Sequence, residues 1–156
     1  AFRLFEGDTV LTTEGRMHVR FKDGTFVELG DDTSFQVERV RLKAAHKDES
    51  VYRFNQGVAR VVNAELGIFN QFTLKTANAI LRVKDASEFY LVQPDEIRDL
   101  TVGFYRGKAK LMCAVTNQNI EIKPGRAAYL KVSGTATQAG IFNAELVNFL
   151  KARTRL

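Results

Sequence analysis

Side chains of the types that commonly do catalytic or metal chemistry are sparse in this chain of 156 residues. Its two histidines are His18, which lies between two arginines, and His46, which lies in a highly charged stretch. Neither histidine has a second histidine, a cysteine or a carboxylate at the spacing of a metal site. The single cysteine, Cys113, lies in the apolar run 111–115, where a small core side chain is expected. These residues predict neither a metal site nor a histidine-based catalytic centre.

Short catalytic motifs are also missing from the sequence. The chain has no Gly-x-Ser-x-Gly nucleophile turn, no Gly-x-x-x-x-Gly-Lys phosphate loop and no His-Glu-x-x-His zinc helix. The neighbouring carboxylates Asp31 and Asp32 fall in a predicted turn, where such side chains cap and solubilise. We therefore expect a protein that is not an enzyme and that uses no cofactor.

Basic side chains offer the clearest candidate for a binding surface. The formal net charge is +5, which favours an anionic partner. Six residues lie on the polar phases of two expected strands: Arg16, His18, Arg20, Arg39, Arg41 and Lys43. If the two strands are neighbours, these residues form a cationic face that suits the phosphate or carboxylate groups of an anionic glycan. The alternative is a solvated face on which Glu28 and Glu38 balance the charge. Nucleic acid is not expected, because no aromatic-plus-basic RNA-binding motif is present.

The elements that would carry these residues have the pattern of short β-strands. Met17, Val19 and Phe21 alternate with polar residues, as in a strand with one buried face. The Asp23-Gly24 pair that follows is a strong signal for a hairpin into the next strand. Similar runs, separated by turn residues, predict strands at 16–21, 26–29, 34–42, 51–55, 58–63, 71–76, 79–84, 87–92, 101–106, 108–115, 118–122 and 127–132.

The regular spacing of these strands predicts an all-β fold of stacked short antiparallel strands, either solenoid-like or a sandwich. Segments 19–29 and 81–91 share Arg, Lys, Asp and Leu at matching positions, which fits a stack of related β-units. The length suits one domain with a sizeable core. No apolar run is long enough to span a membrane, so we do not expect a transmembrane protein.

The C-terminal stretch has a different period. Its apolar residues follow the i, i+4, i+7, i+8 spacing of an amphipathic helix: Phe142, Leu146, Phe149 and Leu150. Lys151, Arg153 and Arg155 follow, where the helix dipole favours positive charge. We therefore predict a β-domain over residues 1–135 and a helical tail or cap over residues 136–156. Such a helix either caps the β-core or docks on a partner.

Several motifs occur in a fixed order along most of the chain. Residues 7–30 contain a Gly-Asp strand start, a Thr-rich turn and an Asp-Gly-Thr hairpin. Residues 54–61 and 72–83 continue the series, and Lys123-Pro124-Gly125 closes it. In this order, from about residue 6 to 132, the motifs resemble those of the FecR family of periplasmic domains. The chain departs from the family pattern at residues 83–86, where members often have Val-Arg-Gly-Thr, and at Ala77, where a family proline is replaced.

This resemblance implies an all-β domain in the bacterial periplasm or at the cell surface. Ala1 is of the type left by signal-peptide cleavage, so we expect a mature exported form. Known members belong to anti-sigma regulators that relay signals from outer-membrane iron-siderophore transporters, and the family implies no catalytic residues. Three functions remain open: binding of another envelope protein with signal relay, self-assembly with copies of the chain as a structural subunit, and binding of an anionic envelope glycan.

Overall fold

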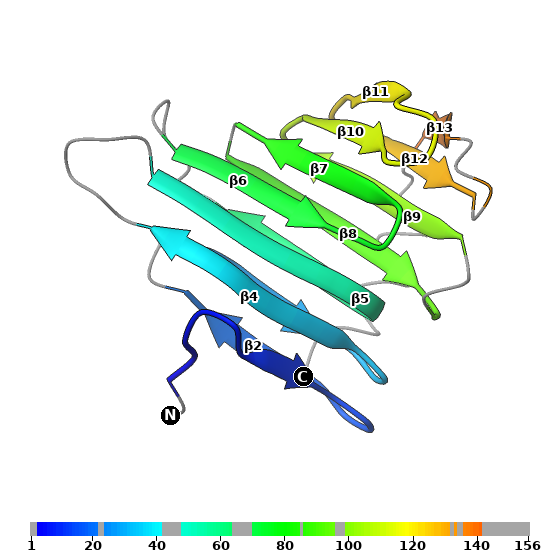
Figure 1. Ribbon diagram of the computed structural model, residues 1–156. Helices are drawn as coiled ribbons and strands as arrows, with labels where there is room; N and C mark the ends of the chain where they lie inside the picture. Colours follow the sequence, from blue (N-terminus) through cyan, green and yellow to red (C-terminus); the bar gives the residue numbers. More distant parts are fainter. Residues whose placement is uncertain are drawn as a thin grey trace.

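The computed structural model describes residues 3–21, 24–41, 48–63, 70–84, 86–95, 99–131, 133 and 136–141. Within these ranges the chain forms thirteen β-strands and no helix (Figure 1). The all-β prediction is therefore confirmed for this part of the protein. Most predicted strands recur close to their expected bounds, because the alternation of polar and apolar residues is regular in this sequence.

The strands form two layers that share β5 (Asp48–Asn63). In layer 1 the hydrogen-bonded order is β1 (Thr9–Leu11), β4 (Ser34–Arg41), β5, β6 (Asn70–Lys75), β7 (Ala79–Val83), β10 (Ala109–Cys113) and β11 (Asn119–Ile122). In layer 2 it is β2 (Met17–Arg20), β3 (Phe26–Leu29), β5, β8 (Ser87–Gln93), β9 (Leu100–Arg106), β12 (Arg126–Leu130) and β13 (Ala136–Ile141). The β5–β6 pair is parallel, and the other described pairs are antiparallel. Since β11 also contacts β12 and β13, the sheet is nearly closed, like a flattened barrel.

Side chains from both layers fill one core. A row of aromatic rings runs through it, with ring centroids 5.3 Å apart for Tyr52 and Phe72, 6.0 Å for Phe72 and Phe89, and 4.7 Å for Phe89 and Phe104. Phe72 belongs to β6 in layer 1, whereas Phe89 belongs to β8 in layer 2. Aromatic pairs at these separations attract beyond the effect of buried area alone. The row therefore ties the two layers together.

Strand β5 passes from layer 1 to layer 2 at Gly57, where the sequence predicts a turn between two separate strands. Residues up to Gln56 pair with β4, whereas residues from Gly57 onward pair with β8. Gly57 has a φ of 108°, and a Cβ atom there would lie 2.5 Å from the Cα atom of Thr33. The backbone amide of Val58 donates a hydrogen bond of 3.0 Å to Thr33 Oγ1. Pairing thus continues through the predicted turn, and the two predicted strands are one.

The start of the predicted helical tail belongs to the sheet. Residues 136–141 form β13, which pairs with β12 in layer 2. The free edge of β12 presents unpaired backbone groups, and an added strand satisfies them. The predicted helical stripe of Phe142, Leu146, Phe149 and Leu150 lies outside the described residues.

Candidate binding surfaces

The structure separates the basic residues that the sequence groups on one face. His18 and Arg20 lie on β2 in layer 2, and the exposed Arg16 precedes that strand. Arg39 and Arg41 lie on β4 in layer 1, and Lys43 is outside the described residues. Because β2 pairs with β3, while β4 pairs with β1 and β5, the two strands are not hydrogen-bonded neighbours. The strand order therefore does not provide the arrangement on which that cationic face depends.

The basic residues of β2 pack on the adjacent strand instead. The imidazole ring of His18 meets the ring of Phe26 edge-on, with centroids 5.2 Å apart. The guanidinium carbon of Arg20 lies 5.8 Å from the centroid of the same ring. This distance is within the range of a cation–π contact. Both side chains are thus held by β3.

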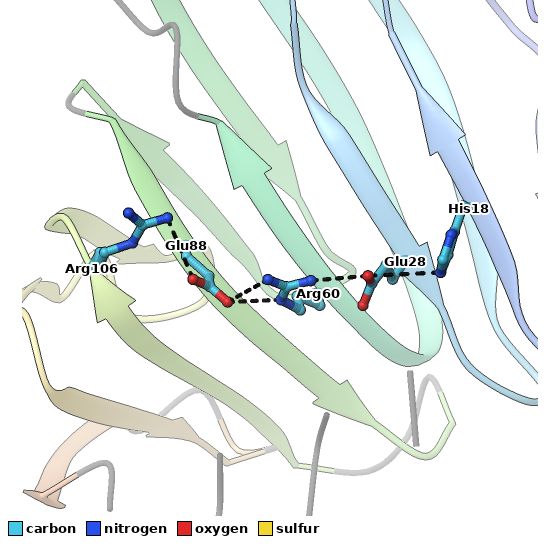
Figure 2. Close-up of polar contacts among 5 residues, drawn as sticks. All are labelled: His18, Glu28, Arg60, Glu88 and Arg106. Carbon is cyan, nitrogen blue, oxygen red and sulfur yellow. Dashed lines mark hydrogen bonds and ion pairs between the residues drawn. The ribbon is translucent and has the colours of Figure 1, made fainter. Parts of the chain in front are cut away.

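A ladder of alternating charges crosses the outer face of layer 2, and Figure 2 shows its five members. Arg60 on β5 is the centre, with its Nη1 atom 2.9 Å from Glu28 Oε1 on β3 and its Nη2 atom 2.7 Å from Glu88 Oε1 on β8. Arg60 Nε also donates a 2.7 Å hydrogen bond to Glu88 Oε1. At the two ends, His18 Nε2 lies 3.7 Å from Glu28 Oε1 and Arg106 Nη2 lies 3.5 Å from Glu88 Oε2. We call these five residues the charge ladder.

The centre of the charge ladder is shielded from water, and its ends are not. The side chains of Glu28 and Glu88 are 7% and 5% exposed, and that of Arg60 is 15% exposed. Burial by itself lowers the pKa of Arg60. The hydrogen bond to Glu88 and the charges of both carboxylates raise this pKa by more than burial lowers it, so the net pKa is above its usual value. Arg60 therefore stays charged. Two buried carboxylates share this one half-buried cation, and Glu28 Oε2 has no hydrogen-bond partner among the described residues.

Sequence reasoning missed the charge ladder. Glu28, Arg60 and Glu88 each lie on the phase of a strand opposite to its core residues, and long stretches of sequence separate them. Only the order β3, β5, β8 brings them together, because Glu28 is in register with Arg60 and Val62 with Glu88. A single charged residue on the outward phase of each of three strands was the available signal, but it does not identify which strands are neighbours.

Two features that would indicate metal binding or membrane insertion are absent from the described residues. The described residues contain no group of three or more His, Cys, Asp and Glu side chains that could hold a metal ion. In the same part of the chain, no helix has the length and apolar character needed to cross a membrane.

Cys113 is expected to be chemically inert in the folded protein. Its side chain is buried in the core on β10, and burial raises the pKa of its thiol, so the reactive thiolate is disfavoured. Labelling with Ellman's reagent at pH 8 should be at least about a hundredfold slower than in urea-unfolded chain, because it requires opening of the core. Fast labelling of the folded protein would contradict this placement.

Comparison with known proteins places the fold in a family. The FecR protein family matches residues 8–110, and no curated protein matches the chain. Two crystal structures, each described as a candidate anti-sigma factor from Parabacteroides distasonis ATCC 8503, are similar in fold. One has a TM-score of 0.73 at 16% identity over 90% of this chain, and the other 0.75 at 15% identity over 92%.

The chain spans 62% and 65% of those two longer chains. At such low sequence identity, the likeness shows a shared fold. The family match is broader evidence, because it starts before β1, ends within β10 and covers well over half of the 156 residues. The chain therefore belongs to the FecR protein family.

Proposed function

We propose that this domain binds another protein of the bacterial cell envelope without catalysing a reaction, and that this binding relays a signal. Membership of the FecR family supports the proposal. The fold shared with candidate anti-sigma factors of P. distasonis supports it as well, because regulators of that kind act through contacts with other proteins. A location in the periplasm or at the cell surface is part of the same proposal.

The observation that carries the proposal is an exposed apolar edge at the start of the chain. Phe5, Leu11 and Met17 are 67%, 68% and 40% exposed. Leu11 lies on β1, which pairs with β4, and Met17 lies on β2, which pairs with β3. No described strand pairs with the other side of β1 or β2. We call the sides of β1 and β2 that have no described partner strand the N-terminal edge; they offer strand backbone to an added strand, and Phe5, Leu11 and Met17 are exposed apolar side chains on or beside them.

Site-specific crosslinking in the cell envelope tests this proposal. A photoreactive amino acid at position 11 is expected to give a discrete adduct with another envelope protein. The same probe at Lys110, which is exposed on the outer face of layer 1, should not give that adduct. Replacing Leu11 and Met17 together with lysine should weaken binding of the captured partner by about tenfold or more, because apolar contacts at the centre of an interface carry most of its energy.

The outcomes separate the competing functions. An equal adduct from positions 11 and 110 would contradict the N-terminal edge as the binding surface. An adduct with only a second copy of the chain would replace signal relay with self-assembly. The lysine variant should keep the unfolding midpoint of the parent chain, since both replaced side chains are already exposed.

A further inference from the structure

The outer face of layer 1 carries more positive than negative charge. Leu74 and Leu81 belong to the core, so their neighbours along β6 and β7 point outward, away from the core. The same alternation holds on β5 and β10, which complete a run of four adjacent strands (Figure 1). Six cations lie on this outer face, the first two half-buried and the others exposed: Arg53, Lys75, Arg82, Lys84, Lys108 and Lys110. We call these six residues the cationic patch.

Like charges face each other within the cationic patch. Arg82 on β7 is directly opposite Lys110 on β10, and Arg53 on β5 is in register with Lys75 on β6. Like charges at opposite positions of paired strands repel and destabilise a sheet. The fold thus brings these cations together at a cost to its own stability, and an anion bound between them would offset that cost.

Acidic side chains are too few on this face to neutralise the cationic patch. Lys75 Nζ lies 2.9 Å from Glu38 Oε2 on β4. Glu121 on β11 is opposite Lys110, but no described carboxylate forms an ion pair with the other five members of the patch. Within the charge ladder on layer 2, by contrast, every cation has a carboxylate partner. The cationic patch therefore has positive charge that is available to an anionic partner.

We propose that the cationic patch docks on the anionic phospholipid headgroups of a membrane surface. The shape of the patch favours a surface over a linear polyanion. From β5 to β10 the patch crosses four adjacent strands, which is about 14 Å at a strand spacing of about 4.8 Å. Along β7 it extends from the level of Ile80, which is in register with Lys75, to Lys84, which is about 13 Å. The patch is therefore about as long as it is wide, whereas a linear chain of phosphates is bound along a groove.

The outward residues between the cations exclude other modes of contact. Thr73, Ile80 and Met112 lie among the cations, and no described outward residue of these four strands is aromatic. Single-stranded nucleic acid is commonly held by stacking of bases on aromatic rings, and insertion into the acyl region uses exposed apolar side chains. Contact through this face is therefore electrostatic and confined to headgroups.

This inference goes beyond the proposed function, because the partner is a lipid surface and not a protein. The N-terminal edge lies at β1 and β2, and β1 and β10 are separated by four strands of layer 1. Docking of the cationic patch would therefore leave that edge accessible to a protein partner.

Co-sedimentation of the full chain with lipid vesicles tests the inference. The chain should bind vesicles that contain phosphatidylglycerol and should not bind vesicles of phosphatidylcholine alone. Raising the salt from about 0.1 M to about 1 M should abolish binding, since the Debye length falls from about 10 Å to about 3 Å. The variant Arg82→Glu with Lys110→Glu should bind at least about a hundredfold more weakly, because each cation at an anionic surface contributes about fivefold and both charges are reversed.

The matched control is Arg16→Glu with Arg20→Glu, which makes the same change in net charge at exposed residues outside the cationic patch. Its affinity should stay within about threefold of the parent chain, because charges more than a Debye length from the headgroups are largely screened. Equal weakening of both variants would overturn the inference, since total charge and not the patch would then control binding. Binding to soluble polyphosphate but not to vesicles would also overturn it, by assigning the patch to a free polyanion.

A neutral variant decides the matter if the reversed charges unfold the chain. Arg82→Gln with Lys110→Gln adds no repulsion with Glu121 and removes the like-charge contact between β7 and β10. It should bind phosphatidylglycerol vesicles about twentyfold more weakly than the parent chain. Unchanged affinity of this variant, or failure of the parent chain to bind these vesicles at low salt, would overturn the inference.

Discussion

Replacing Arg60 with methionine is expected to lower the free energy of unfolding by about 3–5 kcal/mol, because it leaves two carboxylates buried without their shared cation. Both carboxylates are almost fully shielded from solvent, so water cannot replace the lost partner. The end residues cannot replace it either. His18 is 3.7 Å from Glu28, and Arg106 is largely exposed and 3.5 Å from Glu88. Urea unfolding, with the midpoint and slope both fitted, measures the loss.

The matched control removes the charges together. In the triple variant Glu28→Leu, Arg60→Met and Glu88→Leu, no buried charge is left uncompensated, so stability should return to within about 1–2 kcal/mol of the parent chain. This difference would show that the loss of stability in Arg60→Met comes from buried carboxylates left without a cation and not from lost packing of Arg60. A loss below about 1 kcal/mol for Arg60→Met would mean that the charge ladder is screened like a surface ion pair.

The second large effect is expected at the point where β5 changes layers. Gly57→Ala should lower the free energy of unfolding by roughly 2–6 kcal/mol, as the sum of backbone strain and overpacking. The added Cβ would lie within 2.6 Å of the Cβ of Thr33, and backbone atoms of that residue would also have to move. Thr33 cannot move freely, because its hydroxyl accepts a hydrogen bond from the Val58 amide and its own amide donates one to Thr12 Oγ1. Thermal unfolding followed by circular dichroism would record the loss.

Gly7→Ala is the control for this prediction. Gly7 has a φ of 93°, close to the 108° of Gly57, but a Cβ there would meet no atom within 4 Å. The Gly7→Ala variant should therefore be destabilised by backbone strain alone, which lowers the free energy of unfolding by about 1–3 kcal/mol. If the two alanine variants were equally destabilised, the close approach of Thr33 to Gly57 would have no energetic role.

Local regularities made most of the strands predictable. Alternation in Met17 to Phe21 and the Asp23-Gly24 pair locate β2, β3 and the hairpin between them from neighbouring residues alone. The passage of β5 between layers was not predictable, because a glycine in a strand and a glycine in a turn have the same local signature. What distinguishes them is the contact of Gly57 with Thr33, which is distant in sequence.

The candidate surfaces were less predictable than the strands, because they depend on which strands are neighbours. Arg20 and Arg39 follow the same polar pattern, yet they lie in different layers. Glu28, Arg60 and Glu88 point away from the core on three different strands, yet they are largely shielded from solvent together. Alternation indicates which residues share one face of a strand, but it does not indicate the order of strands in a sheet.

The sharing of β5 between the two layers has a mechanical consequence. Each half of β5 has a paired strand on both sides, β4 and β6 in one layer and β3 and β8 in the other. The two layers therefore cannot slide past each other or separate without breaking the hydrogen bonds of β5, the strand that they share. Openings of low free energy are confined to the rims, where β1 and β2 are bonded along one side. A force applied by a partner at that rim would peel edge strands one at a time and leave the body of the domain rigid.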